Sequence, residues 1–195
     1  MPDRKDRFYY LAKSRKYRSR AAFKLIELQQ KFSIISEGDL VLDIGASPGS
    51  WSQVAHEFSG STVIGVDLTR IVEENWMKFM KGDILSPLFP QKLEAFISGL
   101  GIRKFNCIIS DAMSHTSGVH DRDHASSYLL CERVMEIASM FLDTGGNMVI
   151  KQFYGDLTAG FVQKWEEKFR FSKTTSVGAT RKGSSEVYII FKGLL

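Results

Sequence analysis

The sequence is organised around one segment, Leu40-Val41-Leu42-Asp43-Ile44-Gly45-Ala46-Ser47-Pro48-Gly49-Ser50-Trp51. An apolar run ends in an acid, a glycine-rich turn follows, and a helical pattern begins after the turn. This order is typical of the first strand of a parallel α/β sheet, which presents a nucleotide-like ligand at its carboxyl end. The dinucleotide fingerprint G-x-G-x-x-G, counted from Gly45, requires glycine where Ser47 and Ser50 stand. The turn therefore favours a ligand with an adenosine and no pyrophosphate, such as S-adenosylmethionine.

Length and composition favour one globular domain. The chain has 195 residues, and its 44% hydrophobic content is enough for a substantial core. No apolar run approaches the ~20 residues of a membrane span, and the basic N-terminus lacks the apolar stretch of a secretion signal. Cys107 and Cys131 fall in predicted core elements, where we expect buried thiols. These features predict a cytoplasmic protein without membrane contact, acting as a monomer.

Positive charge is concentrated at the start of the chain. Residues 1–24 hold nine lysines and arginines against two acids, a net +7, whereas the whole chain carries +4 and residues 25–195 therefore carry −3. Aromatic residues alternate with these cations, a pattern that suits RNA through phosphate contacts and base stacking. The alternative is a solvated, partly disordered tail. The predicted RNA-binding residues are Arg15, Lys16, Arg18 and Arg20.

Short apolar strands alternate with helical patterns along the rest of the chain. The predicted strands are 40–44, 62–67, 78–84, 105–111, 147–153, 173–177 and 186–192, and the predicted helices are 18–32, 50–58, 87–100, 123–142 and 157–169. Alternation of this kind predicts a mostly parallel sheet with helices on both faces. The last two strands are joined by a turn, so they should pair antiparallel. The pattern predicts a Rossmann-like S-adenosylmethionine methyltransferase fold, with seven strands in the order 3-2-1-4-5-7-6 and one antiparallel strand.

The domain boundaries follow from the same observations. We expect residues 1–23 to form the basic arm and the start of the first helix, and residues 24–195 to form a single methyltransferase domain.

An aspartate lies at the end of each of the first three predicted strands, and we expect these three carboxylates to bind the cofactor. Asp67 is placed to accept both ribose hydroxyls of an adenosine, and Asp83 to accept from the adenine amine. Asp43 is expected to orient the turn or the methionine amino group. The turn contributes two glycines, which let the backbone approach the ligand, and an indole that we expect to pack on the methionine end: Gly45, Gly49 and Trp51.

Four further polar residues should reach the same edge of the sheet: Lys24, Asp111, Lys151 and Glu186. Lys151 lies inside an apolar strand, and a buried cation is costly unless it is paired. Two carboxylates and a second lysine are available to form a charge network around it. This grouping predicts a catalytic centre beside the cofactor turn.

Five segments together resemble the FtsJ/RrmJ family of RNA ribose 2′-O-methyltransferases: Ser19-Arg20-Ala21-Ala22-Phe23-Lys24-Leu25, the Asp43–Trp51 turn, Ser110-Asp111, Val149-Ile150-Lys151 and Ser184-Ser185-Glu186-Val187-Tyr188. The resemblance spans nearly the whole chain. It includes the K-D-K-E tetrad of that family, matched in order by Lys24, Asp111, Lys151 and Glu186. It implies S-adenosylmethionine as cofactor and a uridine of large-subunit ribosomal RNA, or the large ribosomal subunit itself, as substrate.

The same resemblance assigns individual roles. It implies that Lys151 is the proton acceptor, and it matches cofactor contacts to Gly49, Trp51, Asp67, Asp83 and Asp111. The chain departs from the family pattern in two places. Ser47 and Ser50 replace an alanine and a glycine of G-A-A-P-G-G-W, and Ala112-Met113-Ser114 replaces M-A-P after the tetrad aspartate. The second departure changes the loop that faces the substrate, and the first places two hydroxyls at the cofactor turn.

Other functions use the same residues. The tetrad equally serves 2′-O-methylation of tRNA or of an mRNA cap, although the chain has no room for an additional cap-binding domain. An RNA-binding protein without catalysis is the alternative from another class, and an intact tetrad argues against it. His115, His120 and His124 lie with Asp121 and Asp123 in one segment. Asp123 reads there as a helix cap rather than a metal ligand. We expect no metal, and contact of this segment with RNA.

Overall fold

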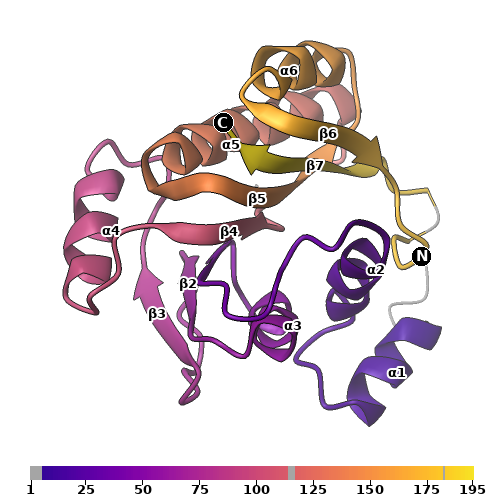
Figure 1. The fold of residues 1–195 in the computed structure, drawn as a ribbon. Helices are drawn as coiled ribbons and strands as arrows, with labels where there is room; N and C mark the ends of the chain where they lie inside the picture. Colours follow the sequence, from indigo (N-terminus) through magenta and orange to yellow (C-terminus); the bar gives the residue numbers. More distant parts are fainter. Residues whose placement is uncertain (1–5, 114–116, 182) are drawn as a thin grey trace.

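A seven-stranded sheet forms the centre of the computed structural model, which describes residues 6–113, 117–181 and 183–195 (Figure 1). In chain order the elements are α1 (Arg7–Ser14), α2 (Ala22–Phe32), β1 (Val41–Ile44), α3 (Ser50–Ser59), β2 (Val63–Asp67), β3 (Met77–Lys81), α4 (Phe89–Ser98), β4 (Phe105–Ser110), α5 (His120–Phe141), β5 (Leu142–Phe153), α6 (Leu157–Glu166), β6 (Phe169–Thr175) and β7 (Glu186–Leu194). The strand order is β3-β2-β1-β4-β5-β7-β6, as predicted.

The pairing confirms a mostly parallel sheet. β1 lies between β2 and β4 and pairs parallel with both, β3 pairs parallel with β2, and β5 with β4. β7 alone runs the other way, antiparallel to both β5 and β6. The register sets Lys151 opposite Tyr188 and Phe153 opposite Glu186. Lys151 and Glu186, both predicted to be catalytic, therefore lie diagonally across adjacent strands, two residues apart in register.

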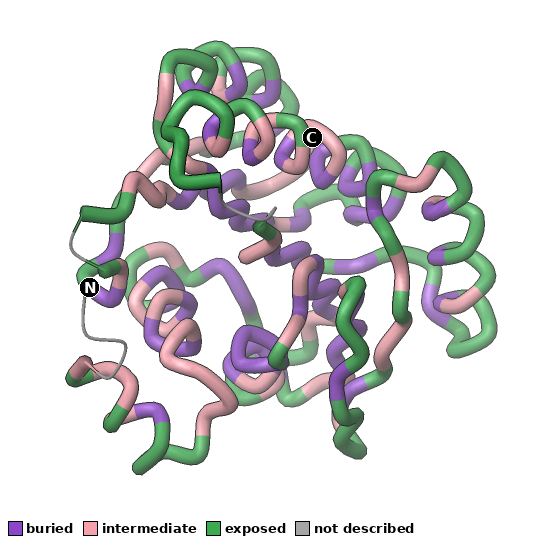
Figure 2. The backbone as a smooth tube through the Cα atoms, turned by 180° about the vertical axis from the view of Figure 1, so that it is seen from behind, coloured by how far each residue is buried: buried purple, intermediate pink, exposed green. Residues whose placement is uncertain are grey.

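Two hydrophobic clusters cover the two faces of the sheet and form a three-layer sandwich. Side chains of α4, α5 and α6 pack on one face, around Leu42, Phe105 and Phe191. Side chains of α2 and α3 pack on the other, around Val41 and Tyr188. The buried positions follow the strands and the inner sides of the helices, while the outer sides are exposed (Figure 2). In the described part of the chain, no helix combines the length and apolar character that crossing a membrane requires.

From residue 6 the basic N-terminal arm is folded, which does not fit the alternative of a partly disordered tail for this part of it. α1 begins at an Asp6 cap, whose side chain accepts from the Tyr9 amide at 3.0 Å. Phe8 packs against Phe23 of α2 with ring centroids 5.6 Å apart. The predicted helix 18–32 begins only at Ala22, after a turn in which the Ser19 hydroxyl accepts from the Ala21 amide. Aromatic packing on α2 thus orders the described part of the basic arm.

Candidate active site

The predicted tetrad is brought together at the carboxyl end of the parallel strands. Lys24 comes from the first turn of α2, Asp111 follows β4, Lys151 lies near the end of β5, and Glu186 opens β7. The four side chains form two ion pairs. Since the four residues come from separate elements, only the folded sheet creates this grouping.

Lys24 and Glu186 form the first pair. Lys24 Nζ donates to Glu186 Oε2 at 2.7 Å, with the two side chains only 12% and 15% exposed. The hydroxyl of the fully buried Tyr188 donates to the same oxygen at 3.3 Å. Burial acts to raise the pKa of Glu186, but the charge and hydrogen bond of Lys24, together with the charge of Lys151, hold it below its ordinary value. Glu186 is therefore an anion at neutral pH.

Lys151 and Asp111 form the second pair. Lys151 Nζ donates to the backbone carbonyl of Asp111 at 2.9 Å and lies 3.3 Å from Asp111 Oδ1. This buried oxygen has no hydrogen-bond partner among the residues that the structure describes, so it can accept a further hydrogen bond. The Lys151 side chain is 3% exposed and that of Asp111 19%. Asp111 thus fixes the position of the lysine nitrogen from two directions.

A cavity of about 400 Å³ opens beside the tetrad. Its described lining comes from the segment before and within α2, from the ends of β4 and β5, and from the loop before β7: Ser19, Arg20, Ala21, Lys24, Met113, Phe153, Arg181, Ser184 and Glu186. A volume of this order suits one nucleotide or a similar small group. Within this lining, Phe153 contributes an apolar side chain and Arg181 contributes an exposed cation.

The glycines of the cofactor turn have conformations that explain their presence. Gly45 has φ +79°, and a Cβ there would lie 2.5 Å from the Cα of Ala112. Gly49 has φ +104° and precedes the first turn of α3. The amides of Gly45 and Ala46 both donate to the carbonyl of Val66, which anchors the turn to β2. The backbone can adopt this close approach only without side chains at these positions.

Asp43 is wholly buried beneath this turn. Its Oδ2 accepts from the Ser52 hydroxyl at 2.5 Å, while Oδ1 has no partner among the described residues. Burial raises the pKa of Asp43 to about 7, and the negative charges of Asp111 and Asp67 add to this effect, against the hydrogen bond from Ser52. An unpartnered, buried acceptor is suited to a cationic group of a ligand.

Asp67 is the last residue of β2, and Asp83 lies in the loop after β3. Asp67 ties the strand end to the turn, since its two oxygens accept from the Ser47 and Thr69 amides at 3.0 and 2.7 Å. Asp83 accepts from the Leu85 amide at 2.9 Å and is exposed. Both carboxylates keep further acceptor capacity. Exposed apolar side chains follow each of them, Leu68 at 64% and Leu85 at 55%, where the flat faces of a base can be covered.

Two residues of the turn segment point elsewhere than the sequence suggested. The Trp51 indole is 3% exposed, donates to the carbonyl of Ala21 at 2.9 Å and packs 6.1 Å from the Tyr188 ring. These contacts support the start of α2 and the Tyr188 ring next to the tetrad. Because the indole is buried, it offers no free face to the methionine end of a cofactor. The Ser50 hydroxyl pairs with that of Ser19 at 2.7 Å. It therefore joins α3 to the α2 turn.

The predicted RNA-binding arginines and lysine divide into two groups. Arg15 and Lys16 are exposed. Arg18 donates to the carbonyl of Pro48 at 3.3 Å and to Glu74 at 2.9 Å, so its guanidinium covers the cofactor turn. Arg20 pairs with Asp6 and donates to the carbonyl of Ala179, with its side chain 12% exposed. Arg20 therefore joins α1 to the loop before β7; it also lines the cavity beside the tetrad, and its contact with RNA stays a prediction.

The histidine segment has a structural role where it is described. His124 is 6% exposed; its Nδ1 lies 2.7 Å from the Phe153 carbonyl, and its Nε2 accepts from the Leu157 amide at 3.1 Å. Asp123 accepts from the Ser117 and Gly118 amides, and these bonds, led by that of Ser117, hold its pKa below its ordinary value. His115 lies outside the described residues. Within the described ranges, no cluster of three potential metal ligands occurs.

Sequence reasoning missed Ser52 and Tyr188 as parts of the site. Ser52 lies in the first turn of α3, where its hydroxyl reaches Asp43. Tyr188 follows Glu186 by two residues, so both side chains lie on the same face of β7. That spacing in Glu186-Val187-Tyr188 was a signal that placed the tyrosine under the tetrad. No comparable local signal identifies Ser52.

Comparison with known proteins places this geometry in context. The family model described as FtsJ-like methyltransferase matches residues 17–194. The ribosomal RNA large subunit methyltransferase E of Picrophilus torridus is 44% identical over 189 residues, which cover 97% of each chain. The protein of the same name from Thermoplasma acidophilum is 41% identical, covering 98% of this chain and 93% of its own. A solved ribosomal RNA methyltransferase of Plasmodium falciparum superposes with a TM-score of 0.79 at 28% identity, covering 92% of this chain and 99% of its own.

Proposed function

The chain belongs to the FtsJ-like methyltransferase family, and we propose that it transfers a methyl group to the 2′-hydroxyl of a ribose in large-subunit ribosomal RNA. One observation carries the proposal: the pairs Lys24–Glu186 and Lys151–Asp111 lie together at the carboxyl end of the parallel strands, and Lys24 and Glu186 line a nucleotide-sized cavity there. The resembling relatives are named for ribosomal RNA. We also propose that the methylated nucleotide is a uridine, as the family resemblance implies.

The residues around the turn suit S-adenosylmethionine as the methyl donor. Asp43 Oδ1 is buried and has no partner in the described part of the chain, which suits the methionine ammonium. Asp67 and Asp83 suit the ribose hydroxyls and the adenine amine, with Leu68 and Leu85 beside the base. S-adenosylmethionine, when bound, supplies a methyl group on a positively charged sulfur that is already strongly electrophilic. The protein is left to position the ribose oxygen and to remove its proton.

We assign Lys151 Nζ as the acceptor of the 2′-hydroxyl proton. Asp111 holds this nitrogen through its carbonyl and carboxylate, so the lone pair can be directed at one point of the cavity. Lys24 and Glu186 line the cavity and position the ribose. Met113 and Phe153 supply apolar contacts that help to exclude water there.

The exposed cations at the start of the chain complete the proposal for RNA. Arg15 and Lys16 lie in the segment that leads to the Ser19–Ala21 wall of the cavity. Phosphates on either side of a nucleotide in the cavity would meet this positive surface. Arg181 lies exposed across the cavity, on the loop before β7.

The test is direct. The purified protein is incubated with S-adenosylmethionine labelled in the methyl group and, separately, with ribosomal RNA, intact large subunits and tRNA from cells that lack the gene. We expect label in the large-subunit RNA or subunit, recovered after alkaline hydrolysis as a resistant dinucleotide, because a 2′-O-methyl group blocks cleavage. Label in tRNA alone favours the tRNA alternative. Binding of RNA without label in any substrate favours a non-catalytic RNA-binding protein.

A further inference from the structure

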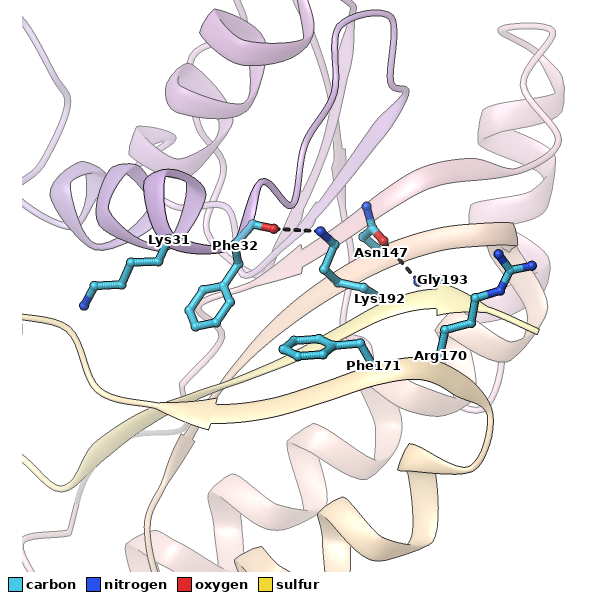
Figure 3. Close-up of a pocket in the computed structure, with 7 residues that line it drawn as sticks. All are labelled: Lys31, Phe32, Asn147, Arg170, Phe171, Lys192 and Gly193. Atoms are coloured by element: carbon cyan, nitrogen blue, oxygen red, sulfur yellow. Dashed lines mark hydrogen bonds between the residues drawn. The ribbon is translucent and has the colours of Figure 1, made fainter.

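A second cavity, of about 420 Å³, lies away from the tetrad, between the C-terminal end of α2 and the sheet edge at β6 and β7 (Figure 3). It is lined by Lys31, Phe32, Asn147, Arg170, Phe171, Lys192 and Gly193. The rings of Phe32 and Phe171 border the hollow, with Lys31 on one side and Arg170 on the other (Figure 3). We call this the α2–β6 pocket. None of its residues belongs to the proposed active site.

The register of β5 and β7 gives its distance from the chemistry. Asn147 pairs with Lys192 at the pocket, and Phe153 pairs with Glu186 at the tetrad. Six residues of strand separate the two pairs, which corresponds to roughly 20 Å. The pocket lies at the opposite end of these strands from the active site. It is within reach of the same RNA molecule but not of the same nucleotide.

Hydrogen bonds fix the frame of the pocket. Asn147 donates to the carbonyl of Ile34 at 2.8 Å and accepts from the Gly193 amide at 3.1 Å. Lys192 donates to the carbonyl of Phe32, the last residue of α2, at 2.7 Å. Gly193 has φ +69°, and a Cβ there would lie 3.1 Å from Cδ of Arg170. Glycine thus lets the arginine stem lie across the strand as one wall.

The α2–β6 pocket is positively charged, whereas residues 25–195 as a whole carry a net negative charge. Its described lining holds three cations, Lys31, Arg170 and Lys192, and no acid. Glu27 pairs with Lys31 at 2.7 Å and offsets one of these charges. The chain after residue 24 carries a net −3, so a local excess of cations is not the average composition of this region. The pocket therefore attracts a polyanion.

The aromatic residues narrow the class of ligand. Phe171 is 44% exposed on the edge strand β6, beside the exposed Arg170. An exposed ring next to cations fits single-stranded RNA, in which a base stacks on the ring while phosphates meet the charges. An acidic protein segment would use the cations without needing the ring face. The combination favours RNA.

We infer that the α2–β6 pocket is a second contact for the RNA substrate, holding an unpaired nucleotide and its phosphate roughly 20 Å from the methylated ribose. This inference rests on the proposed function, because it takes the substrate to be RNA. The pocket positions no reacting atom. Its contribution is to the affinity for RNA and to the choice among RNA molecules that present a single strand at this distance.

The experiment uses the double variant Arg170→Gln/Phe171→Ala and the control Lys92→Gln, which removes one exposed charge from α4 at the far side of the sheet. Binding of a fluorescent oligouridylate of about 20 nucleotides is measured against salt concentration, and methyl transfer to ribosomal RNA is measured as kcat and KM. We expect the double variant to raise Kd and KM about tenfold, with kcat within about twofold, and to lower the salt slope by about 0.7. The control should change neither.

The outcomes separate the two proposals. If the wild-type protein methylates ribosomal RNA and the double variant behaves like Lys92→Gln, the second contact is wrong and the proposed function stands. If the wild-type protein neither binds nor methylates RNA, the proposed function itself fails. A loss confined to intact ribosomal subunits, with oligouridylate binding unchanged, identifies a protein partner and overturns the RNA contact.

A measurement without any variant guards against misfolding of the double variant. Oligouridylate carrying 4-thiouridine is irradiated with the wild-type protein, and the crosslinked peptides are mapped by mass spectrometry. Crosslinks at Phe171 or Phe32 support the second contact. Crosslinks restricted to the segment before α2 and to the Phe153 region contradict it.

Discussion

Lys24 and Glu186 lie 162 residues apart in the chain, yet Lys24 Nζ and Glu186 Oε2 are 2.7 Å apart at the mouth of the active-site cavity. This pair joins α2 to the first residue of β7. It therefore serves the fold and the proposed reaction together, and the two contributions can be separated by mutation.

Glu186→Gln should lower the free energy of unfolding by roughly 1–3 kcal/mol, because Lys24 keeps its charge in a largely buried site without a counter-ion. The double variant Lys24→Met/Glu186→Gln should lose less than the sum of the single variants. Both should have strongly reduced methyl transfer. Urea unfolding and a methylation assay measure the two effects, and additive stability losses would contradict the pairing.

The same pair has a predictable pH dependence. The pKa of Glu186 is lower in the folded than in the unfolded chain, so its stabilising effect is present above the unfolded pKa and is lost as pH falls through the folded one. Below about pH 4 the difference in unfolding free energy between wild type and Glu186→Gln should shrink. Urea titrations across pH 3–7 measure it; a constant difference would refute this linkage.

Lys151→Met should reduce kcat by about two to four orders of magnitude while leaving S-adenosylmethionine binding within about twofold, since Lys151 lies on the tetrad side of the cofactor turn. Methionine keeps the apolar stem inside β5. Lys168→Met, at an exposed lysine beyond α6, is the matched control. Calorimetry gives cofactor affinity and the labelled-methyl assay gives kcat. Turnover near that of wild type would remove Lys151 from the role of proton acceptor.

Asp43 should show a pH effect of the opposite sign. Its pKa is raised to about 7, so the folded state holds a proton that the unfolded state releases, and stability falls as pH rises from about 4 to about 7. Asp43→Asn, which imitates the neutral acid, should therefore be more stable than wild type above pH 7. If the ammonium of the cofactor pairs with Oδ1, wild-type affinity should rise through the same range and that of the variant should not. Parallel affinity profiles would exclude this pairing.

His124→Phe should destabilise the loop between β5 and α6, because the Phe153 carbonyl and the Leu157 amide both lose their partner. Both groups are only partly buried, so the expected loss is roughly 1–2 kcal/mol. Hydrogen exchange at Leu157 should accelerate. His120→Phe, at an exposed histidine of the same helix, provides the control. Unchanged exchange at Leu157 would show that the loop is held by other contacts.

The sequence predicted the sheet from local signals, and the tetrad from the strand ends that these signals place at one edge together with the family resemblance. Apolar runs with acids at their ends, such as Val63–Asp67, mark parallel strands and the edge at which they meet. The fold of the N-terminal segment could not be predicted in this way. Tyr17 donates to Glu57 and Arg20 to the carbonyl of Ala179, partners 40 and 159 residues away. A charge count over residues 1–24 contains no information on such distant acceptors.

Gly45 provides the sharpest test of the cofactor turn. Gly45→Ala would bring a Cβ within 2.5 Å of the Ala112 backbone at φ +79°, so the turn must shift away from β4 and the tetrad side of the cavity. We expect loss of cofactor binding and a lower melting temperature. Gly160→Ala is the control: this residue lies within α6 with nothing within 4 Å of the new Cβ, and alanine should stabilise the helix by about 0.5–1 kcal/mol. Normal cofactor binding by Gly45→Ala would mean that the close approach of the turn to Ala112 is not required.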